Sequence, residues 1–282
     1  MTQDARFQRR IQRYGWDKAV AHYERFWAGQ LKPAQDRLLE LAALRPGERV
    51  LDVACGTGLV TFRAAAQVSP GGAVLATDLS DEMVKSLRET AAERGFTNIT
   101  AERMDAEEPT VPEASFDVAL CALGLMYVPD PRKALEAMRR ALRPPLPGPP
   151  TGGRAAVAVW GARSRCGWAE IFPIVERRVA SEVCPLFFQL GQGDGLAITM
   201  ELAGFGDLMV DRLVTTLRYD SGEDACGAAF AGGPVALAYS RFDQPTRVEA
   251  HAEYLTSIEP FRRGDGYEIP GEFVVARGLR VE

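Results

Sequence analysis

The chain has 282 residues, of which 46% are hydrophobic, and a formal net charge of −5. This length and composition can bury one large core with residues to spare for a lid, whereas the negative charge disfavours wrapping of a nucleic-acid backbone, which needs a clustered basic surface. Two histidines and five scattered cysteines without a Cys-x-x-Cys pair argue against a zinc site and against a disulfide framework, so we expect no metal.

The apolar runs are only as long as strands, which predicts that the chain has no membrane span. Its N-terminus is polar and lacks the apolar core of a signal peptide. We therefore expect a cytoplasmic protein. A homodimer is left open.

Two helices are expected at the N-terminus. Residues 6–31 carry aromatic side chains at helical spacing, and residues 34–43 continue a helical pattern up to a Pro-Gly pair. Because they precede the first strand, we expect residues 1–45 to form a helical lid.

The first strand, residues 49–54, leads into a Gly-Thr-Gly turn at positions 56–58. A helix expected at 58–68 would point its free N–H groups at a ligand held by that turn. The next strand, residues 73–78, ends in Asp78, about twenty residues past the turn, where a carboxylate can accept both hydroxyls of a ribose. These features predict a ligand that contains a nucleoside.

The dinucleotide fingerprint Gly-x-Gly-x-x-Gly is incomplete, because Thr61 stands at the third glycine position. Asp52, just before the turn, would repel a pyrophosphate but could help to bind a cationic or amino-bearing group. A positively charged sulfonium nucleoside with an amino-acid tail therefore fits better than a dinucleotide.

Strands and helices continue to alternate as far as residue 160, which predicts a parallel sheet with helices on both faces. The core is expected over residues 46–164, with further elements as follows: helix 81–94, strand 98–103, strand 116–122, helix 131–142 and strand 154–160.

After residue 160 the alternation is interrupted twice by apolar helical segments, at 165–192 and 222–258. We interpret them as lid insertions. Residues 193–282 should complete the core around the second insertion, with a helix at 194–203, a strand near 207–217 and a last strand at 271–276.

Five segments occur in the order of a known family: residues 52–58, residues 76–83, residues 103–107, residues 116–130, and the two halves of a turn at 142–144 and 152–154. In these segments, which cover residues 45–160, the chain resembles the class I S-adenosylmethionine-dependent methyltransferases, in particular the ubiquinone/menaquinone-biosynthesis type. The resemblance implies a Rossmann-like doubly wound α/β fold, with a seven-stranded, mostly parallel sheet and an antiparallel last strand.

The resemblance also implies S-adenosylmethionine as cofactor. Backbone around the Gly-Thr-Gly turn would hold the methionine moiety, Asp78 the ribose, and Asp105 the adenine amino group. The full set of implied cofactor residues is Asp52, Ala54, Gly56, Thr57, Gly58, Asp78, Leu79, Met83, Asp105, Ala106 and Cys121.

Methyl transfer from a sulfonium is an in-line displacement, which requires alignment, exclusion of water and, for some acceptors, a base. His22 and His251 are the candidate bases because they titrate near neutral pH. The acceptor is expected to be a small, apolar or aromatic molecule held by aromatic and apolar side chains: Tyr14, Trp16, Met126, Tyr127 and Trp160.

Two other functions stay open from the sequence. A nicotinamide-dependent oxidoreductase would have to tolerate Thr61 in the fingerprint, and a non-catalytic S-adenosylmethionine-binding protein would lack an acceptor site. The sequence does not distinguish O-, C-, N- and S-methylation.

Overall fold

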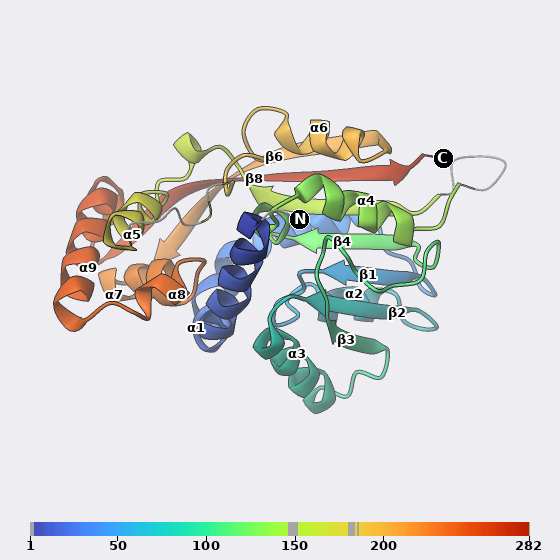
Figure 1. Ribbon diagram of the computed structural model, residues 1–282, viewed down its shortest axis with the longest axis horizontal. Helices are drawn as coiled ribbons and strands as arrows, with labels where there is room; N and C mark the ends of the chain where they lie inside the picture. The colour runs from blue at the N-terminus through green and yellow to red at the C-terminus, as the bar shows by residue number, and fades with distance from the viewer. Residues whose placement is uncertain (1–2, 146–151, 180–183, 185, 282) are drawn as a thin grey trace.

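The structure is a computed structural model that describes residues 3–145, 152–179, 184 and 186–281. In this part of the chain one sheet runs in the order β3-β2-β1-β4-β5-β8-β6, and the short β7 pairs with β8 (Figure 1). The strands are β1 Arg49–Val53, β2 Ala73–Asp78, β3 Ile99–Arg103, β4 Val118–Ala122, β5 Arg154–Trp160, β6 Phe205–Tyr219, β7 Arg262–Arg263 and β8 Gly266–Arg280. The helices are α1 Gln3–Ala42, α2 Thr61–Gln67, α3 Asp81–Glu93, α4 Pro131–Ala141, α5 Ile171–Val179, α6 Gly195–Leu202, α7 Gly222–Cys226, α8 Ala236–Tyr239 and α9 Gln244–Ile258.

The expected sheet is confirmed. Strands β1 to β5 pair in parallel, and β8 inserts antiparallel between β5 and β6. The first five strands lie within two residues of their expected bounds, whereas β6 and β8 are longer than expected, at 15 residues each. Their extra length carries this pair beyond the carboxyl ends of the parallel strands (Figure 1).

The central strands follow from an apolar run that is buried on both faces. In β1 the four residues from Val50 to Val53 are all buried, as a central parallel strand requires. Helix α3 begins where the Ser80 hydroxyl accepts a hydrogen bond from the Met83 N–H at 3.1 Å, and two acidic residues follow in its first turn.

The N-terminal region is one helix rather than the two expected at 6–31 and 34–43. Helix α1 runs through Pro33, which lacks the N–H that would bond the Gly29 carbonyl. Both of these residues are exposed, so water can satisfy that carbonyl. Leu38 and Ala42 further along are fully buried, so packing of the second half on the sheet outweighs the local cost of the proline.

The helices form layers on the sheet and a cap at one edge. Helices α4 and α6 lie on one face, and α2 packs on the other beside the second half of α1, where Arg63 contacts Asp36 (Figure 1). The first half of α1 crosses the carboxyl ends of the parallel strands, with α5 and α7 to α9 beyond it (Figure 1). Among the described residues, no helix has the length and apolar character needed to cross a membrane.

The two expected insertions are helical where the structure describes them. The first, 165–192, contains α5, and its residues 180–183 and 185 lie outside the described residues. The second, 222–258, contains α7, a π-helical turn at Gly227–Ala231, α8 and α9.

Candidate functional site

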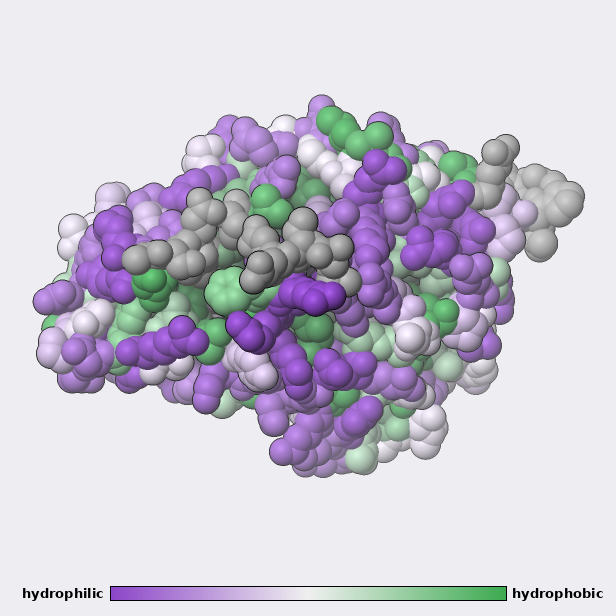
Figure 2. Space-filling model, viewed as in Figure 1, coloured by the Kyte–Doolittle hydropathy of each residue, from purple (hydrophilic) through white to green (hydrophobic). Residues whose placement is uncertain are grey.

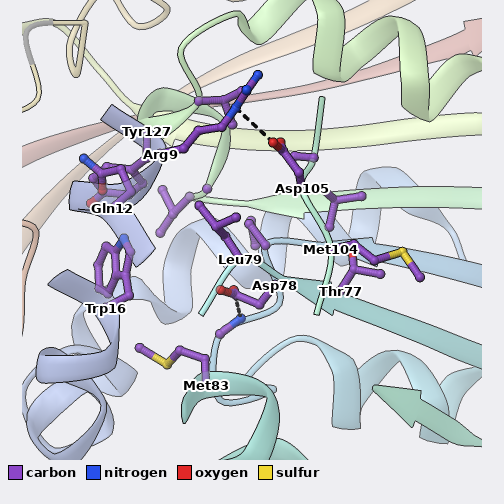
Figure 3. A pocket seen from close by; sticks show the side chains of 18 of the residues that line it. Arg9, Gln12, Trp16, Thr77, Asp78, Leu79, Met83, Met104, Asp105 and Tyr127 are labelled. Carbon is purple, nitrogen blue, oxygen red and sulfur yellow. Dashed lines mark hydrogen bonds and ion pairs between the residues drawn. The ribbon is translucent and has the colours of Figure 1, made fainter. Parts of the chain in front are cut away.

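A cavity lies at the carboxyl ends of β1, β2 and β4, where the strand order reverses and sheets of this kind bind ligands. We call it the edge cavity. Figure 3 shows the first half of α1 on one side of it and the strand ends on the other. Its lining comprises Arg9, Gln12, Trp16, Tyr23, Val53, Ala54, Gly56, Thr77, Asp78, Leu79, Met83, Met104, Asp105, Ala106, Ala122, Leu123, Gly124, Tyr127, Val128 and Pro129.

The floor of the edge cavity depends on small residues. After β1 the chain turns through positive φ angles, including +98° at Gly58, where an added Cβ would lie 2.8 Å from the Phe62 ring. At the end of β4, a Cβ on Gly124 would lie 2.2 Å from that of Ala54. The two strand ends can therefore meet only because Gly124 has no side chain.

Asp78 is fixed by backbone groups at the edge of the cavity. The Gly56 N–H donates to its Oδ2 at 2.9 Å (Figure 3). The Ser80 N–H donates to its Oδ1, also at 2.9 Å. Burial raises the pKa of this carboxyl, and the neighbouring Asp17 raises it further. Each oxygen keeps a lone pair for a further donor, which is the arrangement that ribose hydroxyls need.

Asp105 also lies in the cavity wall, as expected, but α1 already contacts it. Arg9 Nε is 2.9 Å from its Oδ2 (Figure 3). The Glu107 N–H donates to its Oδ1 at 2.9 Å. The Arg9 guanidinium also pairs with the Glu107 carboxylate. An adenine amino group at Asp105 would have to share that carboxylate with Arg9.

Helix α1 is attached over the cavity by three polar residues that the sequence reasoning missed. Arg9, Arg13 and Asp17 recur every four residues and so share one face of the helix. Arg13 pairs with Asp81, and Asp17 accepts a hydrogen bond from the Ser80 hydroxyl at 2.6 Å. Their spacing was visible in the sequence, but their partners on distant loops were not.

Four residues expected to touch the cofactor do not line the edge cavity, so their contact with the cofactor stays a prediction. Asp52, Thr57 and Cys121 are buried beneath its floor, and Gly58 only shapes the turn. Burial raises the pKa of the Cys121 thiol to about 12, so it stays protonated. Asp52 is 1% exposed and accepts a 2.6 Å hydrogen bond from the Thr61 hydroxyl. It therefore supports the turn from below.

A second cavity, which we call the aromatic chamber, adjoins the edge cavity. The two share Trp16, Tyr23, Leu123 and Tyr127 as a common wall. Within this wall the Trp16 ring meets those of Tyr23 and Tyr127 edge-on, at 5.7 and 5.2 Å between centroids. The rest of the chamber is formed by Trp27, Leu31, Met126, Trp160, Trp168, Phe187, Gly233 and Pro234.

The five residues expected to bind the substrate therefore do not all line one cavity. Trp16 and Tyr127 lie between the two cavities, and Met126 and Trp160 lie in the chamber. Tyr14 lies elsewhere: it is 46% exposed and lines a wider outer groove between α1 and α8. It points away from both cavities because it is half a turn from Trp16 on the same helix.

Among the described residues, neither histidine lines the edge cavity, the chamber or the outer groove. The structure therefore does not bring either candidate base to a cavity, and both assignments stay predictions. His22 is exposed on α1, stacked on Phe26. His251 Nε2 lies 2.9 Å from the Tyr239 hydroxyl, and its ring packs on Phe230. Burial, and to a lesser extent a nearby arginine, lowers the pKa of His251. The described residues contain no cluster of three or more potential metal ligands.

Comparisons with known proteins agree with this geometry. Residues 50–145 match the family described as "Methyltransferase domain". Nocamycin O-methyltransferase of Saccharothrix syringae is 36% identical over 129 residues, which are 46% of this chain and 46% of that protein. A ubiquinone/menaquinone biosynthesis C-methyltransferase of Teredinibacter turnerae is 39% identical over 120 residues, 42% of this chain and 45% of that protein. The chain thus spans about half the length of these curated relatives.

Solved structures show the same fold. Phosphoethanolamine N-methyltransferase 2 of Haemonchus contortus, in complex with S-adenosyl-L-methionine, superposes with a TM-score of 0.61 at 17% identity, covering 94% of this chain and 57% of that one. Sequence motifs, strand order and family match agree. The chain therefore contains a methyltransferase domain of the class I S-adenosylmethionine-dependent type, resembling that of the ubiquinone/menaquinone-biosynthesis enzymes.

Proposed function

We propose that this chain is an S-adenosylmethionine-dependent methyltransferase that acts on a small, apolar or aromatic molecule. One observation carries the proposal: a cavity suited to a nucleoside shares a wall of Trp16, Tyr23 and Tyr127 with a chamber lined by apolar and aromatic side chains. Cofactor and acceptor would meet where the two cavities adjoin, beside these rings, so that the acceptor could reach the methyl group directly.

The described residues fit the cofactor at several points. Asp78 would accept the ribose hydroxyls, and Leu79 and Met83 would flank the adenine. Asp105 and the Ala106 N–H would meet its polar edge. The backbone at Ala54 and Gly56, which lines the cavity, would hold the methionine moiety.

When bound, S-adenosylmethionine supplies an electrophilic methyl group for in-line displacement. The shared wall would exclude water, and its ring faces favour a positive charge beside them. Burial raises the pKa of Tyr23 and of Tyr127, so both phenols stay neutral. They can orient an acceptor but not remove its proton at neutral pH. We therefore propose catalysis by alignment, with an acceptor that has released its proton to bulk solvent before it enters the chamber.

The chamber argues for an enzyme over a non-catalytic cofactor-binding protein, which would have no use for an acceptor site. Its walls come from α1, from the strand ends and from both insertions, through Trp168, Phe187 and Pro234. The outer groove shares Met126 and Tyr127 with it and offers a route from solvent. Figure 2 shows apolar side chains between hydrophilic ones where α1 approaches the α7 to α9 end.

S-adenosylhomocysteine should raise the melting temperature, because it binds the folded state only, whereas NAD should have little effect. The reason is the missing third glycine of the dinucleotide fingerprint, because Thr61 stands at that position. Differential scanning fluorimetry with S-adenosylhomocysteine, NAD and NADP at equal concentration checks this. A larger shift with NAD would reject the methyltransferase proposal in favour of an oxidoreductase.

We propose that the first half of α1 is the lid, and that the second half is a fixed part of the core. Its first half reaches the cavity mainly through ion pairs and the Trp16 ring, whereas Leu31 and Leu38 in the second half are buried on the sheet. Residues 5–17 should gain protection from hydrogen exchange when S-adenosylhomocysteine binds, and residues 31–42 should be protected throughout. Equal protection of residues 5–17 with and without ligand would show a static helix.

The remaining expectations stay predictions. They are a core over residues 46–164, a role for 165–192 and 222–258 in covering the acceptor, a cytoplasmic location, no nucleic-acid partner, and a homodimer. Size-exclusion chromatography coupled to light scattering would show whether the chain forms a homodimer.

A further inference from the structure

The outer groove between α1 and α8 has the room that the chamber lacks. Its volume is about 760 Å³, against about 30 Å³ for the chamber. Sites for drug-sized molecules have roughly 300–1,000 Å³. Gln12 and Tyr127 line the groove as well as the edge cavity. An acceptor can therefore keep its body in the groove and place one end at the edge cavity.

Helix α1 gives the groove two chemically different ends. Arg10 and Gln12 both line it, although they lie about 200° apart around the helix axis. The groove-lining side chains that project between them are apolar or aromatic with one exception: Phe7, Gln8, Ile11 and Tyr14. The groove thus follows the helix from Gln12, at the edge cavity, across a largely apolar surface to Arg10.

The far end of the groove carries positive charge. Arg10 and Arg241, which follows α8, are both exposed and form no ion pair within the described part of the chain. Arg10 contacts only the Phe7 ring, with its guanidinium carbon 5.6 Å from the ring centroid. None of the described residues that line the groove is acidic. Two arginines without a counter-charge fit a carboxylate, which a guanidinium can bind through two parallel hydrogen bonds.

The end at the edge cavity carries a neutral donor instead. The Gln12 side-chain amide donates to the Cys184 sulfur at 3.2 Å. Burial raises the pKa of that thiol to about 12, so its sulfur is uncharged and a weak acceptor. An oxygen atom of a ligand is the stronger acceptor and can replace it. Such an oxygen lies at the boundary between the groove and the edge cavity.

We propose that the outer groove binds a hydroxylated aromatic carboxylic acid in one orientation. The carboxylate lies at Arg10 and Arg241, the rings lie against the apolar face of α1, and the hydroxyl group lies beside Gln12. This rests on the proposed function, since the hydroxyl oxygen is the methyl acceptor. It enters as the oxyanion, after its proton has gone to bulk solvent. Its lone pair forms the new C–O bond, the S–CH₃ bond breaks, and the electron pair of that bond stays on sulfur.

Calorimetry with 4′-hydroxybiphenyl-4-carboxylate and its carboxamide tests the charged end, because the two molecules differ in charge and hardly in shape. With the protein saturated with S-adenosylhomocysteine, the carboxylate should bind about 10-fold more tightly. Arg10→Gln and Arg241→Gln should each reduce that ratio to about 3-fold. Gln12→Leu should weaken both ligands and leave the ratio unchanged. Arg6→Gln, at an exposed position of the same helix outside the groove, is the matched control and should alter neither affinity.

The position of the transferred methyl group tests the orientation. With S-adenosylmethionine in place of S-adenosylhomocysteine, mass spectrometry should detect a methyl ether of the biphenyl acid, which resists alkaline hydrolysis. A methyl ester, a ratio near one in the parent protein, or a ratio unaffected by both arginine variants would overturn the proposal. Binding of S-adenosylhomocysteine, measured before the acid is added, tests the proposed function separately. A protein that binds it but shows no preference for the carboxylate overturns this inference alone.

Discussion

Replacing Asp78 with alanine should weaken binding of S-adenosylhomocysteine by at least about 100-fold. A hydrogen bond to a charged group contributes roughly 1.5–3 kcal/mol, and the carboxylate would receive two ribose hydroxyls. Two such bonds amount to about 3 kcal/mol or more, where each 1.4 kcal/mol is a factor of ten. The variant also leaves the Gly56 and Ser80 N–H groups without their acceptor, which loosens the turn itself.

Isothermal titration calorimetry of the folded variant checks this result. Asp211→Ala is the matched control, since it also removes a carboxylate with two contacts, both to Arg37, but lies outside the edge cavity. Its affinity should equal that of the parent. An Asp78→Ala protein that folds and binds S-adenosylhomocysteine as tightly as the parent would remove Asp78 from the site.

Asp52→Asn should stabilise the protein at pH 8 by roughly 4 kcal/mol and have little effect near pH 4. Burial raises the pKa of the Asp52 carboxyl to about 7, from about 4 in an unfolded chain. Between these values the folded state keeps a proton that the unfolded state has released. The contribution of this carboxyl to stability is therefore fully present below pH 4 and is lost as the pH rises to 7.

Asparagine cannot ionise, and its side-chain oxygen still accepts from the Thr61 hydroxyl, so the variant should lack this pH dependence. Urea unfolding of both proteins from pH 4 to pH 8 measures the difference. Thr61→Val sharpens the test, because the Thr61 hydrogen bond lowers the pKa of Asp52. Loss of this hydrogen bond should raise the pKa of Asp52, so the pH at which the free energy of unfolding falls should be higher in Thr61→Val. A constant difference between Asp52→Asn and parent across this range would contradict a protonated Asp52 in the folded state.

Local sequence patterns predicted those parts of the fold that depend on neighbouring residues. The buried run of β1, its glycine turn and the acidic end of β2 are contiguous, and each has a recognisable physical reason. The positions of Asp78, Leu79, Met83 and Asp105 at one cavity followed from their place at the ends of parallel strands.

Features that depend on contacts between distant segments were not predictable in this way. The sequence predicted separate helices at 6–31 and 34–43, but burial of the second on the sheet keeps one continuous helix through Pro33. The partners of Arg9 lie almost one hundred residues away. The histidines were chosen for their chemistry, yet helix orientation places them away from the cavities.

The aromatic chamber is the clearest case. Trp27, Trp160 and Trp168 come from a helix, a strand end and an insertion, and only the folded chain brings them together. Each taken alone is an ordinary core residue.

A crystal structure with S-adenosylhomocysteine tests most directly the claim that the cofactor binds in the edge cavity and faces the aromatic chamber. We expect both ribose hydroxyls to donate hydrogen bonds to the Asp78 carboxylate. We expect the sulfur to point toward Trp16, Tyr23 and Tyr127, the wall that the two cavities share. A ribose bound elsewhere, or a sulfur directed away from that wall, would contradict it.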